Sequence, residues 1–280
     1  MELPTPPVPH ALTWATTIDV LPCDRQTVRS DDHWVIRSPG NPSHYWGNLI
    51  LFDDPPAAGD ADRWEHVFAA AFADDPRIGH VTLAWDRTHG ELGYAHKAFL
   101  DRGYELNETV ALTAPPDGLA PHARASGEVT VRALDPAPGA DAEAWAGVLE
   151  LQLANYPGSE GERQFSQQRL DDLRRLFCAG RGAWYVALAD HEVAGSCGIV
   201  VTAGRARFQL VDTALAHRRR GVCSRLVVDA AGHAAAHHAV DRFVICADPH
   251  YHALGLYQSL GFRRTEHTAG VCRPPQRSSG

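Results

Sequence analysis

The sequence predicts a mixed α/β protein of two domains in tandem, each a mixed central sheet flanked by helices. Three observations lead to this prediction. The chain has 280 residues, which is enough for two cores of ordinary size. Its second half alternates strand-like and helix-like segments. A pattern at the end of one helix in the first half returns about 158 residues later, which indicates an internal duplication.

Apolar residues of the second half follow the period of a strand or of a helix in turn. A strand at 129–134 precedes two helices, whose apolar residues recur at helical spacing over 145–153 and 165–177. Short breaks at 191–192 and 203–204 are typical of hairpin turns between strands. The remaining expected elements are, in order, strands 184–188, 196–202 and 207–213, a helix 221–238, a strand 243–247, a helix 250–260 and final strands from Phe262.

Composition excludes several classes of protein. With 44% hydrophobic and 21% charged residues, the chain is typical of a globular protein, and no apolar run reaches the roughly 20 residues of a membrane helix. The opening residues lack the basic start and apolar run of a signal peptide, which predicts a cytoplasmic protein. A net charge of -8 argues against nucleic acid as a partner.

Cysteine and histidine usage gives no sign of disulfides or of a metal. The six cysteines lie far apart without a C-x-x-C pair, so we expect reduced thiols. There are 16 histidines, of which His233 and His237 are one helical turn apart. No third ligand follows at a characteristic spacing, so we interpret the pair as part of a solvated face and predict no metal site.

The segment from Ala114 to Pro121 is dense in proline and glycine, and the chain stays polar as far as Gly127. Such a segment cannot continue a helix or a central strand. We therefore expect a boundary here, with residues 1–125 as the first domain and its linker and residues 126–280 as the second.

One segment, 210–226, predicts an anion site. An expected strand enters a short basic loop, His217-Arg218-Arg219-Arg220, and a helix begins directly after Gly221. Amide groups at a helix start have no partner within the helix and lie at the positive end of its dipole, so they bind phosphate or pyrophosphate. The alternative is a solvated basic turn that caps the helix.

A second segment, from His250 to Phe262, follows about 30 residues later. Together the two segments resemble the GNAT superfamily of acyl-CoA-dependent N-acyltransferases, over about residues 128–272. Arg218–Cys223 resemble its R/Q-x-x-G-x-G/A signature, with Cys223 in place of the usual Gly or Ala. The second segment resembles its N-x-x-A-x-x-L-Y-x-x-x-G-F pattern, with His250 in place of the usual Asn. The matching residues there are Ala253, Leu256, Tyr257, Gly261 and Phe262.

The resemblance implies an acetyl-CoA site. Val211 and Thr213 would pair their backbone with the pantetheine arm where two central strands splay. His250 stands where the family often contacts the cofactor. The backbone amides that would hold the pyrophosphate belong to Arg218, Arg219, Arg220, Gly221, Val222, Cys223 and Ser224.

The resemblance also implies a catalytic acid. Tyr257 falls where many members of the family keep a general acid that protonates the departing thiolate. A phenol pKa of about 10 is close enough to that of a thiol for this transfer. The alternative for Tyr257 is a packing residue that is hydrogen-bonded to the cofactor sulfur.

The sequence leaves the identity of the general base open between several residues. Some members of the family place a glutamate early in the fourth strand, but this chain has Ala206-Arg207-Phe208-Gln209 there. Asp212 is the nearest acid in sequence, although strand alternation turns it away from the cleft. A water chain to His250, His252 or Glu150 is the other option.

Two further features modify the expectation. Cys223 at a helix start could have a lowered thiol pKa, but we favour a small residue that fills the Gly/Ala position.

In the first half, Phe99-Leu100-Asp101-Arg102-Gly103-Tyr104 repeats the pattern of Tyr257–Phe262. After the strand at 48–52, however, the chain reads Asp53-Asp54-Pro55-Pro56, which repels phosphate and lacks amide donors. We therefore expect a degenerate GNAT-like domain without an acyl-CoA loop.

These inferences predict an N-acetyltransferase, of the EC 2.3.1 type, which transfers an acetyl group from acetyl-CoA to a primary amine of a small-molecule acceptor. The amine attacks directly in a ternary complex, and the protein is a monomer or a homodimer with no membrane partner. One alternative is a non-catalytic acyl-CoA-binding sensor. It is supported by Cys223, by His250 and by the lack of a glutamate early in the fourth strand. Another is an acyltransferase whose donor is a carrier protein or an aminoacyl-tRNA.

Overall fold

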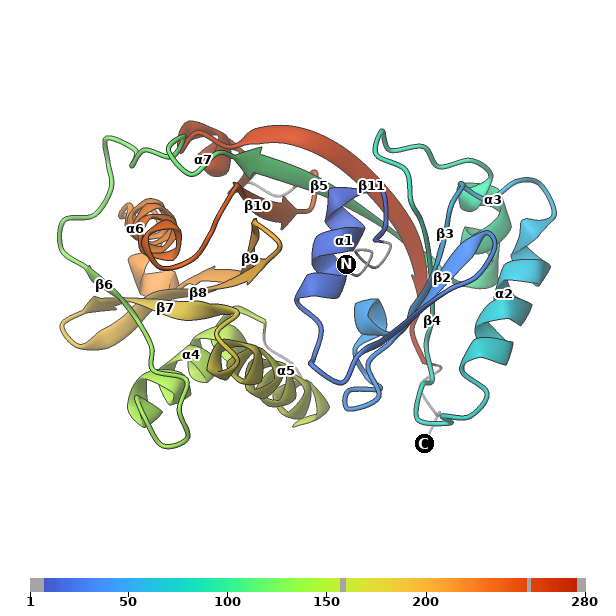
Figure 1. The fold of residues 1–280 in the computed structure, drawn as a ribbon, viewed down its shortest axis with the longest axis horizontal. Coiled ribbons are helices and arrows are strands. Elements are labelled where there is room, and N and C mark those ends of the chain that lie inside the picture. The colour runs from blue at the N-terminus through green and yellow to red at the C-terminus, as the bar shows by residue number, and fades with distance from the viewer. Residues whose placement is uncertain (1–7, 157–159, 251–252, 276–280) are drawn as a thin grey trace, which may run out of the picture. The chain divides into compact units, whose positions relative to one another are not determined.

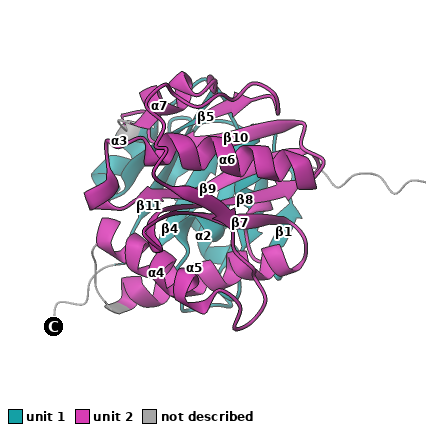
Figure 2. Ribbon diagram, turned by 90° about the vertical axis from the view of Figure 1, so that its left-hand side faces the viewer, with its two compact units in different colours: residues 1–18, 24–110, 266–280 teal, residues 19–23, 111–265 magenta. Residues whose placement is uncertain are grey.

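The computed structural model describes residues 8–156, 160–250 and 253–275. It divides the chain into two compact units, shown in teal and magenta in Figure 2. Unit 1 holds the residues up to 18, residues 24–110 and the residues from 266 onward. Unit 2 holds residues 19–23 and 111–265, so the segment 111–125 groups with the second half of the chain.

Unit 1 is an α/β unit with its helices packed against a mixed sheet. Strand β2 pairs antiparallel with β1 and β3, β3 lies parallel to β4, and β4 pairs antiparallel with β11. The elements of the first half are α1 (Leu12–Asp19), β1 (Gln26–Arg29), β2 (His33–Arg37), η1 (Tyr45–Gly47), β3 (Leu49–Phe52), α2 (Asp60–Ala71), β4 (Val81–Trp85), α3 (Ala95–Phe99), η2 (Leu100–Arg102) and β5 (Glu105–Ala114).

Unit 2 repeats this arrangement. Strand β8 pairs antiparallel with β7 and β9, and β9 lies parallel to β10. The elements of the second half are β6 (Thr130–Ala133), α4 (Ala142–Asn155), α5 (Glu160–Cys178), β7 (Gly182–Ala189), β8 (Glu192–Thr202), β9 (Arg205–Thr213), η3 (Leu215–His217), α6 (Val222–His237), β10 (Arg242–Ala247), α7 (Ala253–Ser259) and β11 (Arg263–Arg273). The mixed α/β fold predicted from the sequence is thereby confirmed.

Helices cover both faces of the sheet of unit 2, and strand alternation explains how (Figure 1). Trp184 of β7 packs against Trp145 of α4, with ring centroids 5.9 Å apart. Its neighbour Tyr185 points to the other face and meets His233 of α6, with centroids 5.4 Å apart. Since successive side chains of a strand alternate between faces, α4 and α5 lie on one face and α6 on the other.

Two tight hairpins connect the antiparallel strands of unit 2. Asp190 and His191 between β7 and β8 both have positive φ, as do Ala203 and Gly204 between β8 and β9. Two successive residues with positive φ are the mark of a type I′ turn, whose twist matches that of the strands. The sequence placed both turns to within one residue.

The last strand of each half is shared between the units. Strand β5 begins in unit 1 and continues past Val110 into unit 2, whereas β11 begins in unit 2 and continues past Thr265 into unit 1. Nothing in the local sequence pattern of these strands indicates this exchange. The described part of the chain has no helix that is long and apolar enough to cross a membrane.

The repeated sequence pattern forms the same helix end in both halves. The Tyr104 amide donates to the Phe99 carbonyl and the Phe262 amide to the Tyr257 carbonyl, each at 3.2 Å. Gly103 and Gly261 provide the positive φ that this C-terminal cap requires. The two glycines differ in their surroundings: a Cβ at Gly103 would meet nothing within 4 Å, whereas one at Gly261 would lie 2.1 Å from the Gly118 carbonyl oxygen.

This difference predicts unequal effects of one substitution at two equivalent positions. Gly103→Ala should lower the free energy of unfolding by about 1 kcal/mol, the cost of a left-handed residue with a side chain. Gly261→Ala should lower it by clearly more, because the segment around Gly118 must move. Urea denaturation followed by tryptophan fluorescence measures both. Equal losses would contradict the packing of residues 118–119 on the second helix end.

Candidate active site

The site begins where two parallel strands of unit 2 separate. Strand β9 is in register with β10 at three pairs, from Arg205 opposite Arg242 to Arg207 opposite Val244. Beyond these pairs β9 continues to Thr213 and β10 to Ala247 without further pairing to each other among the described residues. Backbone groups on this edge of β9 are thereby left for another partner.

A β-bulge in β9 sets which side chains reach this opening. Ser196 of β8 lies opposite Asp212, whereas Gly198 lies opposite Gln209, so β9 carries one extra residue between the two pairs. Leu210, within the bulge, has a φ of 46°. A bulge interrupts strand alternation and re-aims the residues that follow it. Simple alternation along the sequence therefore gives the wrong orientation for Asp212.

A basic loop links β9 to α6. It passes through η3, and Arg219 and Gly221 take positive φ before α6 starts at Val222. The first turn of a helix offers amide groups without intrahelical partners, together with the positive end of the dipole. A side chain at Gly221 would place its Cβ 1.8 Å from the Arg124 carbonyl oxygen, so only glycine fits there.

A cavity of about 450 Å³ lies between the open edge of β9, this loop and α7. Most of the residues that the sequence analysis singled out line it. They are Val211, Thr213, Arg218, Arg219, Gly221, Val222, Cys223, Ser224 and Tyr257. The cavity thus combines cationic side chains, a helix start and a buried tyrosine, which is 5% exposed.

Two predicted residues, Arg220 and His250, lie outside this lining. The guanidinium of Arg220 forms an ion pair with Glu128, with an N–O distance of 2.8 Å. The amide of His250 donates to Asp248 Oδ1 at 2.7 Å, and its side chain is exposed. His252, a candidate for the base, lies outside the described residues.

The sequence analysis missed a wall of the cavity that the expected linker provides. His122 and Arg124 line the cavity. The His122 amide donates to Ser224 Oγ at 3.0 Å, and the Ser126 amide donates to the Gly221 carbonyl at 3.2 Å. A proline-rich, polar segment is typical of an exposed linker, so no local signal marked these residues as part of the site.

A chain of hydrogen bonds runs through the cavity lining, from exposed Arg218 to buried Asp212. Arg218 Nη2 donates to Asn155 Oδ1 at 2.8 Å, and Asn155 Nδ2 donates to Asp212 Oδ1 at 2.9 Å. Burial raises the pKa of the Asp212 carboxyl to about 6, against the opposing hydrogen bond from Asn155 and the charges of Arg218 and Arg169. Asp212 and Asn155 also line the cavity.

Cys223 is not a reactive thiol in this environment. Burial raises its pKa to about 12, the direction opposite to that of an activated cysteine. The residue occupies the second position of α6 and lines the cavity, so it fills space there. The described residues contain no group of three His, Cys, Asp or Glu side chains that could hold a metal ion.

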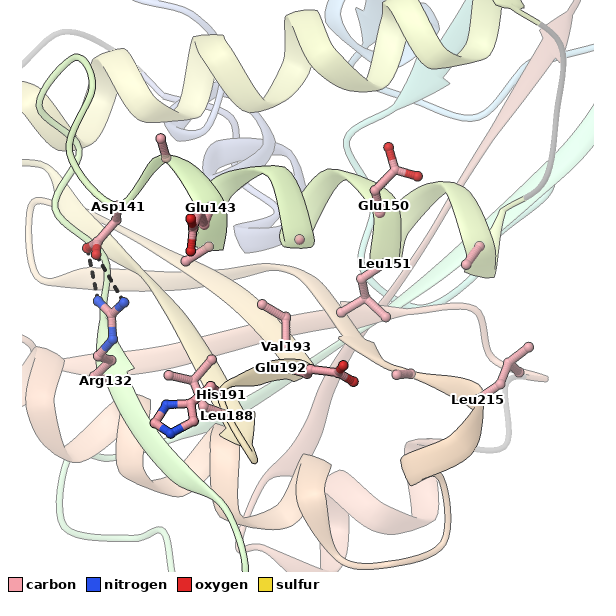
Figure 3. A pocket seen from close by; sticks show the side chains of 15 residues that line it. Arg132, Asp141, Glu143, Glu150, Leu151, Leu188, His191, Glu192, Val193 and Leu215 are labelled. Atoms are coloured by element: carbon pink, nitrogen blue, oxygen red, sulfur yellow. Dashed lines mark hydrogen bonds and ion pairs between the residues drawn. The ribbon is translucent and has the colours of Figure 1, made fainter.

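A larger cavity of about 810 Å³ lies between α4 and the hairpin of β7 and β8 (Figure 3). Arg132, one of its lining residues, forms an ion pair with Asp141 at 2.9 Å. The other charged groups are the acids Glu143, Glu150 and Glu192. The smaller cavity is the more favourable of the two for an anion, because acids repel phosphate and the basic loop lines only the smaller one.

The equivalent place in unit 1 is filled with aromatic rings. There β3 stays in register with β4 up to Phe52 opposite Trp85, so these strands do not part. Trp64 of α2 stacks on Phe52 with ring centroids 3.8 Å apart, and it also contacts Trp85 and Phe99. All four rings are at most 2% exposed. Unit 1 therefore has no opening at this point for an acyl donor.

Comparison with known proteins identifies a family for the second half. Residues 145–262 match the model of the acetyltransferase (GNAT) family. No curated protein sequence matches the chain.

Several solved structures have a similar fold. Their sequence identity to this chain is low, so the similarity concerns the fold alone. A functionally unknown conserved protein from Staphylococcus epidermidis has a TM-score of 0.68 and 11% identity over 89% of this chain and 94% of its own. A GCN5-related N-acetyltransferase from Kribbella flavida has a TM-score of 0.61 and 12% identity, over 89% and 90%. A tandem GNAT protein from the clavulanic acid biosynthesis pathway has a TM-score of 0.57 and 16% identity, over 97% and 91%.

The matched segment contains the open edge of β9, the basic loop and Tyr257, the features around which the smaller cavity is built. The chain therefore carries a GNAT-family acetyltransferase domain over residues 145–262, within a fold that resembles a tandem GNAT protein.

Proposed function

We propose that this protein is an N-acetyltransferase that transfers an acetyl group from acetyl-CoA to a primary amine of a small molecule. The smaller cavity carries the proposal, because it joins a helix start and three arginines, Arg124, Arg218 and Arg219, to the open edge of a strand. We place catalysis in the second half of the chain, expected over residues 126–280. The first half, expected over residues 1–125, serves as a degenerate domain apart from its last part, where His122 and Arg124 line the catalytic cavity.

The groups of acetyl-CoA match the hydrogen-bond donors and the positive charges of this cavity. Its pyrophosphate would lie at the start of α6, where amides from Val222 to Ser224 and the charges of Arg218 and Arg219 favour an anion. Its pantetheine arm carries amides, which would pair with the backbone of Val211 and Thr213 where β9 has parted from β10. Arg124 adds a cation to the lining of the same cavity.

The reaction is a direct transfer. The nitrogen of a neutral amine attacks the thioester carbonyl carbon, the carbon–sulfur bond breaks, and the thiolate leaves. The thiolate takes up the proton of the Tyr257 phenol, which lines the cavity from α7, and the proton that the attacking nitrogen loses as it becomes an amide restores the phenol. The net charge of -8 supports a cationic amine rather than a nucleic acid as the acceptor.

If Tyr257 is the acid, Tyr257→Phe should lower kcat by about 10²-fold and leave the Kd for acetyl-CoA unchanged. Thiol release measures kcat, and calorimetric titration measures Kd. Tyr185→Phe is the matched control, because Tyr185 is equally buried but its hydroxyl bonds to His233 outside the cavity. An unaltered kcat in Tyr257→Phe would remove the phenol from the mechanism.

The position of the anion site predicts which arginines matter for donor binding. Arg124→Ala and Arg218→Ala should each weaken CoA binding by about tenfold, the value of one charge-assisted hydrogen bond. Arg220→Ala should have a smaller effect, since its side chain pairs with Glu128. Arg163→Ala, an exposed arginine paired with Glu150, is the control. Calorimetric titration with CoA should also give one binding site per chain. Two sites would contradict the aromatic packing that fills the equivalent place in unit 1.

A further inference from the structure

Asp212 is the one acid in the lining of the smaller cavity among the described residues, and it is almost fully buried. Its side chain is 4% exposed. Oδ1 accepts the hydrogen bond from Asn155, whereas Oδ2 is buried without a hydrogen-bond partner. A buried carboxylate oxygen without a partner costs free energy of folding, so such a group calls for a ligand or a reaction that uses it.

Asn155 fixes the orientation of this carboxylate. Its Oδ1 accepts from Arg218 and its Nδ2 donates to Asp212, so the amide cannot turn over without losing both bonds. A second, weaker contact joins Nδ2 to the Thr213 carbonyl at 3.4 Å. Asn155 ends α4, which is packed against the sheet through Trp145 and Val148. The carboxylate is therefore held by a rigid element.

The other groups around Asp212 do not compete for its role. The cations that act on it are Arg218 from the basic loop and Arg169 from α5. The thiols that it influences are Cys223 of α6 and Cys197 of β8, and burial raises the pKa of each. Neither thiol is ionised near neutral pH, so neither competes with Asp212 for a proton there. The histidines that share the cavity lining with Asp212 are His122 and His217.

The other base candidates from the sequence that the structure describes, Glu150 and His250, lie outside the smaller cavity. Glu150 is exposed, pairs with Arg163 and lines the larger cavity. His250 lies outside the lining of the smaller cavity. Tyr257 shares the smaller cavity with Asp212, but the proposed mechanism uses its phenol as a proton donor.

We propose that Asp212 accepts the proton that the acceptor ammonium loses, and that Asn155 is the residue that positions it. This inference rests on the proposed function and narrows the acceptor to an aliphatic amine, which arrives protonated. The ammonium nitrogen gives one proton to Oδ2 and keeps its electron pair, and that pair forms the bond to the acetyl carbon. The carboxyl later releases the proton to water.

Kinetics test the catalytic role directly. The acceptor is whichever of ethanolamine, putrescine, lysine and tyramine the wild type acetylates fastest with saturating acetyl-CoA. Asp212→Asn should lower kcat by about 10²-fold, without weakening acetyl-CoA binding. The wild-type kcat should fall as pH drops through about 6, because the carboxyl becomes protonated there. This acidic limb of the pH profile should be missing in Asp212→Asn.

Three comparisons make the kinetic result specific. Aniline, which is neutral at pH 7, should lose less rate in Asp212→Asn than the aliphatic amine. Asn155→Ala should lower kcat and move the acidic limb, as expected of a positioning residue. Asp172→Asn replaces another aspartate that is 4% exposed in unit 2, paired with Arg175, and should keep the wild-type kcat. An unchanged kcat in Asp212→Asn would overturn the inference.

Thermal unfolding gives a readout that needs no turnover. Because the folded-state pKa of Asp212 is raised above its unfolded value, this carboxyl lowers stability as pH rises from about 4 to above 6. Asp212→Asn should therefore raise the melting temperature relative to wild type, and by more at pH 7.5 than at pH 4. A purely structural aspartate would show the opposite, a lower melting temperature on substitution, and that result would overturn the inference.

The two proposals fail in different ways. If the wild type binds no CoA and releases no thiol with any amine, the proposed function and the catalytic role of Asp212 are both wrong. If the wild type turns over but Asp212→Asn does so equally well, only the inference about the proton acceptor is wrong.

Discussion

The parting of β9 from β10 is the feature on which the site of unit 2 depends. Two parallel strands that stay paired satisfy each other's backbone groups and leave no room between them. Here the pairing stops after Arg207 opposite Val244, and the bulge at Leu210 turns the rest of β9. The opening is bounded by the start of α6 and by α7. A basic helix start, an open strand edge and a buried tyrosine are thereby brought together in one cavity.

Unit 1 shows what the same topology does when the strands remain paired. Its β3 and β4 keep their register to the last residue of β3, and four aromatic rings close the space that α2 and α3 enclose. Burying the rings of Phe52, Trp64, Trp85 and Phe99 stabilises this arrangement by the hydrophobic effect. The helix end at Gly103 has the same cap as that at Gly261, so this half keeps the architecture of the fold with an aromatic core at this place.

The cavity of unit 2 is less favourable for stability than the core of unit 1. It holds a carboxylate oxygen of Asp212 without a partner and a positive φ at the non-glycine residues Leu210 and Arg219. Strain and unpaired polar groups of this kind gather at sites that bind or react, and the surrounding packing holds them in place. The Asn155 amide limits the cost by donating a hydrogen bond to one oxygen of the carboxylate, and Arg218 donates to the oxygen of that amide.

Local patterns in the sequence predict the elements of the second half, the hairpin turns, the basic loop before α6 and the repeated helix ends. These features follow from local periodicity, glycine conformation and helix capping, which act within a few residues. Local patterns do not predict the exchange of β5 and β11, the wall that Arg124 contributes or the orientation of Asp212. Each of these depends on contacts between residues far apart in the chain, and the bulge at Leu210 breaks the alternation from which a sequence infers direction.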